Sequence, residues 1–256
     1  MKKLFVPIGL CIACCLLSIP KVYAQTTAAN ELSEKFVTAA MNDDADLQNY
    51  VNELATYSKE NLENQIQTND QKKAFWLNLY NGYVLYLLKD NPELYEARSS
   101  FFSNEQFTVA GERMSLDDVE HGMIRNSRIK ISKGLLKKFF PSSFERTFRV
   151  TEVDWRIHFA LNCGAKSCPP VDVYEVATLE EKLKASSIDY LNENVEYDDQ
   201  NNSVSVPVLM SWFSADFCGK KGVRNILKKI DLIPQDTKPE IKYLDYDWTL
   251  DLDNYK

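Results

Sequence analysis

The sequence predicts an α+β fold, a single helix-rich domain with a small, mostly antiparallel sheet or hairpins. Apolar residues recur at three- and four-residue steps along most of the chain after residue 28, as in amphipathic helices. The segments with strand-like alternation are few and short, and they flank turn residues. We find no repeat, low-complexity stretch or linker that would divide the chain into two domains.

Residues 1–24 have the features of a secretory signal peptide. Lys2 and Lys3 form a basic start, and the stretch from Leu4 to Pro20 is largely apolar and uncharged. Val22-Tyr23-Ala24 then offers a cleavage site before Gln25. We therefore expect export to the periplasm or the extracellular space, and one globular domain over residues 25–256 with a helical edge at 25–68.

Cleavage would leave few reactive side chains. Cys11, Cys14 and Cys15 lie within residues 1–24, so three cysteines and two histidines remain in the mature chain. An odd number of cysteines in an oxidising compartment leaves at least one thiol free, modified or bonded to another chain. The alternatives to a soluble exported protein are a retained membrane anchor and a lipoprotein acylated at Cys14 or Cys15.

The charge argues against a nucleic-acid partner. The whole chain carries a net charge of −7, and three of its lysines but no acidic residue lie within residues 1–24, so the mature chain carries −10. Proteins that bind nucleic acids normally present a basic face. The mature chain has no apolar run of transmembrane length, and we expect no cofactor. The ligand, a small molecule or a peptide, and the oligomeric state are not predicted.

The first half of the chain is predicted to be mainly helical. Its elements are a pair of helices over 28–68, a long central helix over 71–88 capped at Asn69-Asp70, a hairpin over 107–114, a helix over 115–126, and a short helix over 132–140. The central helix is apolar nearly all round, which is typical of a buried helix. Ser115 and Asp118 have the spacing of a capping box, and Pro141 ends the last helix.

The second half mixes helices with short strands. Its elements are a helix or strand over 154–161, a turn over 163–170, an amphipathic helix over 178–192, a hairpin of 195–197 with 204–208, helices over 209–217 and 223–230, and a final strand over 241–248. The four residues Asp199-Gln200-Asn201-Asn202 are typical of the turn of a hairpin.

Two polar pairs occur at helical spacing. Asn78 and Asn81 share a face of the most apolar helix, where a buried amide must be hydrogen-bonded. Either they fix neighbouring backbone, or they line a pocket and orient a catalytic group or ligand. His121 and Arg125 share a face of the capped helix. This pair is either a surface pair or, if it faces inward, a site that binds an anion or orients a base.

The segment from Asp154 to Pro170 contains the highest concentration of potentially reactive side chains. His158, Cys163 and Cys168 occur within eleven residues of a chain that is otherwise poor in both residue types. A cysteine with a histidine base is a common nucleophile. A Cys163–Cys168 disulfide would instead close a short loop, and His121 with His158 and both cysteines would make a Cys₂His₂ metal site. All three chemistries stay open at this point.

Four segments together resemble the DUF547 family of uncharacterised proteins. They are Phe75–Asn81, Ser115–Arg125, His158–Ala165 with Ser167-Cys168-Pro169, and Val206–Phe217, and the similarity extends from about Lys73 to Ile230. The chain departs from the family at Trp155, where proline is frequent. The resemblance implies no established reaction. Some members are fused to glutaredoxin-like domains, which favours thiol chemistry, and plant relatives vary at the cysteine positions.

Two functional hypotheses follow. The first is a Cys/His-dependent enzyme for acyl transfer or hydrolysis of a peptide, amide or thiol substrate. Its nucleophile is Cys163, its base is His158 or His121, Cys168 lies nearby, and Asn78, Asn81, Arg125 and Asn162 bind the substrate or orient these groups. The second is a non-catalytic binding module of the cell envelope with a Cys163–Cys168 disulfide. It would bind through the aromatic side chains of Tyr80, Tyr83, Trp212 and Phe213. The metal site is the third alternative.

Overall fold

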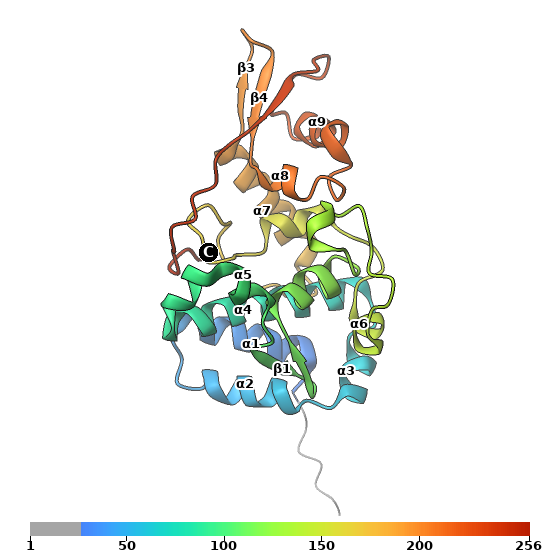
Figure 1. Cartoon of the computed structure of the whole chain (residues 1–256), viewed down its shortest axis with the longest axis vertical. Coiled ribbons are helices and arrows are strands. Elements are labelled where there is room, and N and C mark those ends of the chain that lie inside the picture. Colours follow the sequence, from blue (N-terminus) through green and yellow to red (C-terminus); the bar gives the residue numbers. More distant parts are fainter. Residues whose placement is uncertain (1–26) are drawn as a thin grey trace, which may run out of the picture.

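The structure is a computed structural model that describes residues 27–256, and it has the predicted α+β fold (Figure 1). Its α-helices are α1 (Ala29–Asn42), α2 (Leu47–Thr56), α3 (Lys59–Gln65), α4 (Asn69–Asp90), α5 (Arg98–Ser103), α6 (Ser143–Phe148), α7 (Leu179–Asn194), α8 (Leu209–Trp212) and α9 (Gly219–Lys229). Tighter or wider helical turns are η1 (Pro92–Ala97), η2 (Asp118–Ile124), η3 (Lys130–Ser132) and η4 (Trp155–Phe159). The predicted signal peptide and cleavage site lie outside the described residues, so export stays a prediction.

The strands form two small sheets. They are β1 (Phe107–Val109), β2 (Glu112–Met114), β3 (Glu196–Asp198), β4 (Ser203–Val206) and β5 (Glu240–Tyr243). β1 pairs antiparallel with β2, and β4 lies between an antiparallel β3 and a parallel β5. Both predicted hairpins are confirmed. The last strand is shorter than predicted, because the chain beyond Tyr243 leaves the sheet and returns to the helical part.

The central helix α4 is confirmed, and it begins earlier than predicted. Thr68 forms a capping box with Gln71, so the cap precedes the predicted Asn69-Asp70. Buried residues occur on every face of α4. Gly82 lets α1 approach closely, because a Cβ atom there would lie 2.5 Å from the ring of Phe36.

Residues 28–68 form three helices, and the predicted pair is wrong. Ser58 starts α3 by accepting a hydrogen bond from the backbone of Asn61. The Ser115–Asp118 capping box is confirmed, and it leads into the π-helical η2. In this wide helical turn the backbone N–H of Arg125 donates to the carbonyl of Glu120, five residues earlier.

Two other predicted helices differ in the structure, and one segment predicted as a helix or a strand is helical. Residues 132–140 form no helix, because Lys133 and Gly134 adopt left-handed backbone angles with φ of 52° and 84°. The predicted helix over 209–217 is shorter and ends at Trp212. The ambiguous segment over 154–161 contains the tight helix η4, whose N-cap is Asp154. The amphipathic helix α7 is confirmed.

Two main clusters of buried apolar residues hold the fold together. The larger one surrounds α4, and the smaller one lies among the three-stranded sheet, α8 and α9. Tyr246 packs against both clusters. The C-terminal segment then runs back to the helical part, where Leu250 and Tyr255 bridge to Ala165 and Val171 (Figure 1). Within residues 27–256, no helix is long and apolar enough to cross a membrane.

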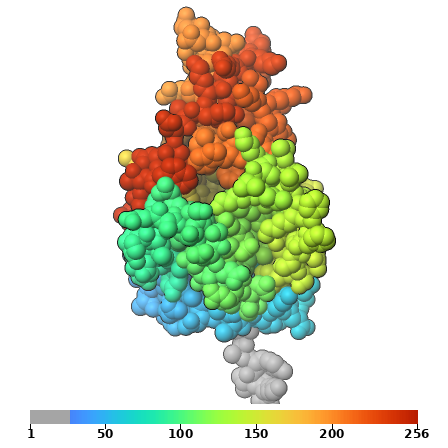
Figure 2. Space-filling view, in the orientation of Figure 1, coloured from blue at the N-terminus to red at the C-terminus, as the bar shows by residue number. Residues whose placement is uncertain are grey.

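A hollow lies where these two parts of the molecule meet. Figure 2 shows it on the viewed face, bounded by the green and yellow-green segments below and the orange and red C-terminal segments above. Helix α4, helical turn η2 and the turn after η4 reach it from the larger cluster. Helix α8 and the segment after β5 reach it from the smaller one.

Candidate functional site

The hollow contains a cavity of about 430 Å³ with largely apolar walls. Aromatic side chains from four segments form much of its surface, namely Tyr80, Phe102, Trp212, Phe213, Tyr246 and Trp248. Glu120, His121, His158 and Cys163 also line it. A concave, largely apolar pocket with a few converging polar groups is the usual form of a binding or catalytic site.

His158 is held by a buried carboxylate from the loop after α8. Its Nε2 atom lies 3.0 Å from Oδ2 of Asp216, and the same oxygen accepts a hydrogen bond of 2.7 Å from Nε of Arg125. The side chains of Arg125 and Asp216 are fully buried. On the other side, the ring of Phe213 stacks on His158 with centroids 4.0 Å apart, and it lies 4.5 Å from the guanidinium carbon of Arg125.

These contacts fix the proton on one nitrogen of His158. Burial alone would raise the pKa of Asp216, but the hydrogen bonds from His158 and Arg125 outweigh it and lower the pKa, so the carboxylate is ionised. Burial also lowers the pKa of His158, so the imidazole is neutral near pH 7. A neutral imidazole that donates from Nε2 to Asp216 has its lone pair on Nδ1. His158 can therefore accept a proton at Nδ1.

His121 is the opposite tautomer. Its Nδ1 atom lies 2.8 Å from Nη1 of Arg125, and a guanidinium only donates, so Nδ1 accepts and Nε2 carries the hydrogen. Burial and the charge of Arg125 lower the pKa of His121 to about 3. Its Nε2 atom is buried without a hydrogen-bond partner among the described residues. His121 is therefore a neutral donor, so of the two candidate histidines only His158 has a free lone pair.

Cys163 and Cys168 meet at one hydroxyl group. The Sγ atoms lie 3.4 Å and 3.1 Å from the Tyr246 hydroxyl, and the backbone N–H of Cys163 donates to Sγ of Cys168 over 2.9 Å. A hydrogen bond from the Cys168 thiol lowers the pKa of Cys163; burial opposes this, and Tyr246 adds to it. Burial raises the pKa of Cys168 well above its usual value. Cys163 is thus the thiol that ionises first, and it is the one that lines the cavity.

Two buried amides hold the turn that carries Cys163. Asn81 on α4 donates to the carbonyl of Ala160 and accepts from the N–H of Asn162, each over 2.9 Å. Asn162 in turn accepts from Gly164 over 2.7 Å and donates to the carbonyl of Pro169 over 2.8 Å. Gly164 has a φ of 83°, which suits glycine. Asn81 and Asn162 therefore shape the turn, and neither lines the cavity.

Asn78 fixes a different loop. It donates to the carbonyl of Tyr174 over 2.9 Å and accepts from the N–H of that residue over 2.8 Å. Its amide also lies 3.2 Å from the hydroxyl of Ser33. These contacts correspond to the structural interpretation of Asn78, away from the cavity.

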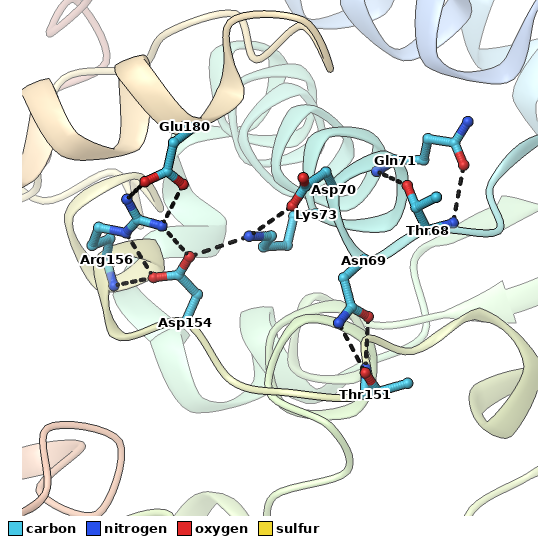
Figure 3. A network of polar contacts seen from close by, with 9 residues as sticks. All are labelled: Thr68, Asn69, Asp70, Gln71, Lys73, Thr151, Asp154, Arg156 and Glu180. Carbon is cyan, nitrogen blue, oxygen red and sulfur yellow. Dashed lines mark hydrogen bonds and ion pairs between the residues drawn. The ribbon is translucent and has the colours of Figure 1, made fainter.

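A network of charged groups anchors the start of η4 and so positions His158 (Figure 3). Arg156 pairs with both oxygens of Asp154 over 2.9 Å and 2.7 Å, and with both oxygens of Glu180 on α7 over 2.7 Å and 2.8 Å. Lys73 on α4 reaches Asp154 over 3.2 Å. Paired contacts between an Arg fork and a carboxylate fix orientation as well as position. This network connects α4, η4 and α7, and none of its residues lines the cavity.

A family comparison covers most of these elements. The model described as "Protein of unknown function, DUF547" matches residues 64–191, which is half of the chain. The chain belongs to the DUF547 family. No curated protein and no solved structure matches it.

The DUF547 match contains both histidines, Arg125 and the Cys163–Cys168 turn, but it ends before Asp216 and Tyr246. Sequence reasoning missed these two residues, together with Glu120, which lines the cavity 3.5 Å from Nδ1 of His121. Asp216 had one available signal, because it lies in the Val206–Phe217 segment that carries part of the family resemblance. Nothing in the sequence points to Tyr246.

The alternatives for the cysteines can be compared with this geometry. The structure has Cys163, Cys168 and Cys218 as free thiols. The two histidines contact Asp216 and Arg125, and neither hydrogen-bonds to a thiol in the described part of the chain. Over residues 27–256, no group of three or more His, Cys, Asp or Glu side chains is placed to hold a metal ion. In the predicted aromatic platform, Tyr83 is buried and stacks on Phe107, so it cannot contact a ligand.

Proposed function

We propose that this exported DUF547 protein is a cysteine-dependent enzyme that transfers or hydrolyses an acyl group of a peptide, amide or thioester. One observation carries the proposal. Cys163, whose pKa is lowered, lines the same cavity as His158, whose lone pair on Nδ1 is fixed by Asp216. A nucleophile, a base and a group that orients the base are the parts that such a reaction needs. The basic and apolar start of the chain supports export.

Because the two histidines are opposite tautomers, His158 acts as the base and His121 as a hydrogen-bond donor. Cys163 gives its proton to Nδ1 of His158, and the thiolate attacks the carbonyl carbon of the substrate, whose π electrons move to the oxygen. When that electron pair returns, the bond to the leaving group breaks, and His158 gives its proton to the leaving amine or thiol. Water or another acceptor then attacks the thioester carbon while His158 accepts its proton. Collapse of this second adduct releases the acyl product and the Cys163 thiolate, and His158 returns the proton to that thiolate. Atoms and electrons balance without an external oxidant or reductant.

His121 supplies the group that the negatively charged oxygen needs. Its Nε2–H is buried and makes no hydrogen bond within the described residues, although Oδ1 of Asp117 lies 3.6 Å from Nε2, and the residue lines the same cavity. A preorganised donor at a developing oxyanion is commonly the largest electrostatic contribution to acyl transfer. Arg125 acts through other residues, because it donates hydrogen bonds that fix the tautomer of His121 and the position of Asp216. Arg125 and Asp216 are therefore positioning residues.

The cavity favours an apolar acyl group or side chain. Its aromatic walls, among them Trp212, Tyr246 and Trp248, offer stacking surfaces, and Trp212 and Trp248 lie with their rings 5.6 Å apart. The carboxylate of Glu120 lies beside His121 and accepts a hydrogen bond of 3.4 Å from the Tyr80 hydroxyl. This carboxylate suits recognition of an amine or amide N–H of the substrate.

A generic acyl donor tests the proposal. The reduced protein is incubated with p-nitrophenyl acetate and p-nitrophenyl butyrate, nitrophenol release is followed, and the acylated peptide is mapped by mass spectrometry. We expect an acyl group on Cys163, its loss in Cys163→Ser, and slow acylation in His158→Asn. Cys218→Ser is the matched control, because Cys218 is exposed and does not line the cavity. Acylation elsewhere than on Cys163 would contradict the proposal.

The binding-module hypothesis is the second candidate, and the contact between the two cysteine residues favours it. Cys163 and Cys168 share the Tyr246 hydroxyl, and the backbone N–H of Cys163 donates to Sγ of Cys168, so the two residues lie side by side where oxidation would join them in a disulfide. A disulfide would remove the nucleophile. Intact-mass analysis of the protein isolated without reductant distinguishes the two functions. A mass lower by two hydrogens supports the disulfide, and the reduced mass supports the enzyme.

A further inference from the structure

The segment over residues 128–140 carries an unusual combination of exposed apolar and cationic side chains. Among the described residues, most of the large apolar side chains that are exposed lie in this one segment, namely Ile131, Leu135, Leu136, Phe139 and Phe140. Phe140 is 97% exposed, Ile131 92% and Phe139 86%. Isolated exposed apolar residues are normal on protein surfaces, but a contiguous group marks an interaction site.

The same segment is strongly basic within an acidic protein. It contains Arg128, Lys130, Lys133, Lys137 and Lys138, and no acidic residue occurs between Glu120 and Glu145, although the whole chain carries −7. Asp117 pairs with Lys130 and Glu145 with Lys138. Lys133 and Lys137 have no acidic partner within residues 27–256. Burial and the nearby charges of Arg128 and Arg149 lower the pKa of Lys137, so an anion placed there would relieve repulsion.

Backbone hydrogen bonds hold residues 128–140 in a defined conformation. The two ends of the segment pair through a bridge between Arg128 and Lys137, with hydrogen bonds of 2.9 Å from Ile129 to Leu136 and 2.8 Å from Lys138 to Ser127. The backbone N–H of Ala215 also donates to the carbonyl of Lys133 over 3.0 Å. Left-handed angles at Lys133 and Gly134 turn the chain between these contacts. The fold therefore holds the apolar side chains outward rather than burying them.

We propose that residues 128–140 dock on the surface of an anionic lipid bilayer. Phenylalanine and leucine side chains insert at the boundary between headgroups and acyl chains, and lysine side chains bind the lipid phosphates, as in other interfacial segments. The mixture of charge and apolar side chains favours this partner over a second copy of the chain, because two copies would bring ten cations together. Lys130, Ile131 and Lys133 also line the cavity, so docking would bring its rim to the lipid surface.

Vesicle binding tests the proposal. The full chain is mixed with extruded vesicles of phosphatidylcholine alone or with 30% phosphatidylglycerol, as a roughly physiological anionic fraction, and binding is measured by flotation at low and high salt. We expect the anionic vesicles to bind more protein, and salt to weaken the binding. Both Phe139→Ser/Phe140→Ser and Lys133→Glu/Lys137→Glu should lower the partition coefficient at least about tenfold. Lys220→Glu/Lys221→Glu on α9 is the matched control for charge.

A local readout separates this contact from binding by the apolar start of the chain. Hydrogen exchange measured by mass spectrometry should slow in residues 128–140 when anionic vesicles are added, and should not slow with neutral vesicles. Circular dichroism checks that each variant is folded. Unchanged exchange in this segment, or equal flotation of wild type and Phe139→Ser/Phe140→Ser, would overturn the proposal. So would a dimer in solution that Phe139→Ser/Phe140→Ser converts to a monomer, because a second copy would then cover the surface.

Discussion

Replacing Asp216 by asparagine removes a charge without changing the shape of the side chain. The Asp216 carboxylate is fully buried, and its Oδ2 atom accepts hydrogen bonds from Arg125 over 2.7 Å and His158 over 3.0 Å. The substitution leaves the buried guanidinium of Arg125 without a counter-charge. Removal of one partner from a buried ion pair typically costs about 3–5 kcal/mol. We expect Asp216→Asn to lower the free energy of unfolding at pH 7 by that amount.

Urea denaturation at several pH values measures this effect. The pKa of Asp216 is lowered in the folded state, so its contribution is present above the usual pKa of 3.8 and is lost as the pH falls through the lower folded value. The difference between wild type and Asp216→Asn should therefore narrow below about pH 4. Asp236→Asn, at an exposed turn, is the control and should leave stability nearly unchanged. A loss below about 1 kcal/mol for Asp216→Asn at pH 7 would refute the charge-pair account.

Two other substitutions probe the groups around this pair. Burial lowers the pKa of His121 to about 3, so the unfolded chain binds a proton that the folded chain does not between pH 3 and 6.5. Wild type should lose up to about 1.4 kcal/mol of stability per pH unit in that window as the pH falls, and His121→Asn should flatten this slope in urea titrations; an equal slope would contradict it. Asn81→Ala leaves the Ala160 carbonyl and the Asn162 N–H unsatisfied. It should cost about 2–5 kcal/mol in the same assay, while the exposed Asn52→Ala should cost less than about 0.5 kcal/mol.

The sequence predicts those elements whose residues act locally. The buried helix α4, the Ser115–Asp118 capping box and both hairpins depend on periodicity and on turn residues within a few positions. The failed helix over 132–140 has helical composition, but the chain turns at Lys133 and Gly134 because Lys133 binds the backbone of Ala215. That contact joins residues more than eighty positions apart, and no local pattern encodes it.

The candidate site shows the same division. The sequence singles out Cys163, His158 and Arg125 because cysteine and histidine are rare in the chain and Arg125 follows His121 at helical spacing. Asp216 and Tyr246 reach the site from segments 58 and 83 residues further along the chain, as their contacts with His158 and Cys163 show. Only the folded structure places them. It also distinguishes the two histidines, because the tautomer of each depends on a partner that the sequence does not identify.

The rate of alkylation of Cys163 as a function of pH tests the central claim most directly. The reduced protein is treated briefly with iodoacetamide at each pH, and the labelled cysteines are quantified by peptide mass spectrometry, with the exposed Cys218 as internal control. We predict that Cys163 is alkylated near pH 7 with a midpoint below the usual cysteine pKa of 9.0, and that Tyr246→Phe raises this midpoint. A Cys163 that stays unlabelled after reduction, or reacts only with a midpoint at or above 9.0, would contradict the account.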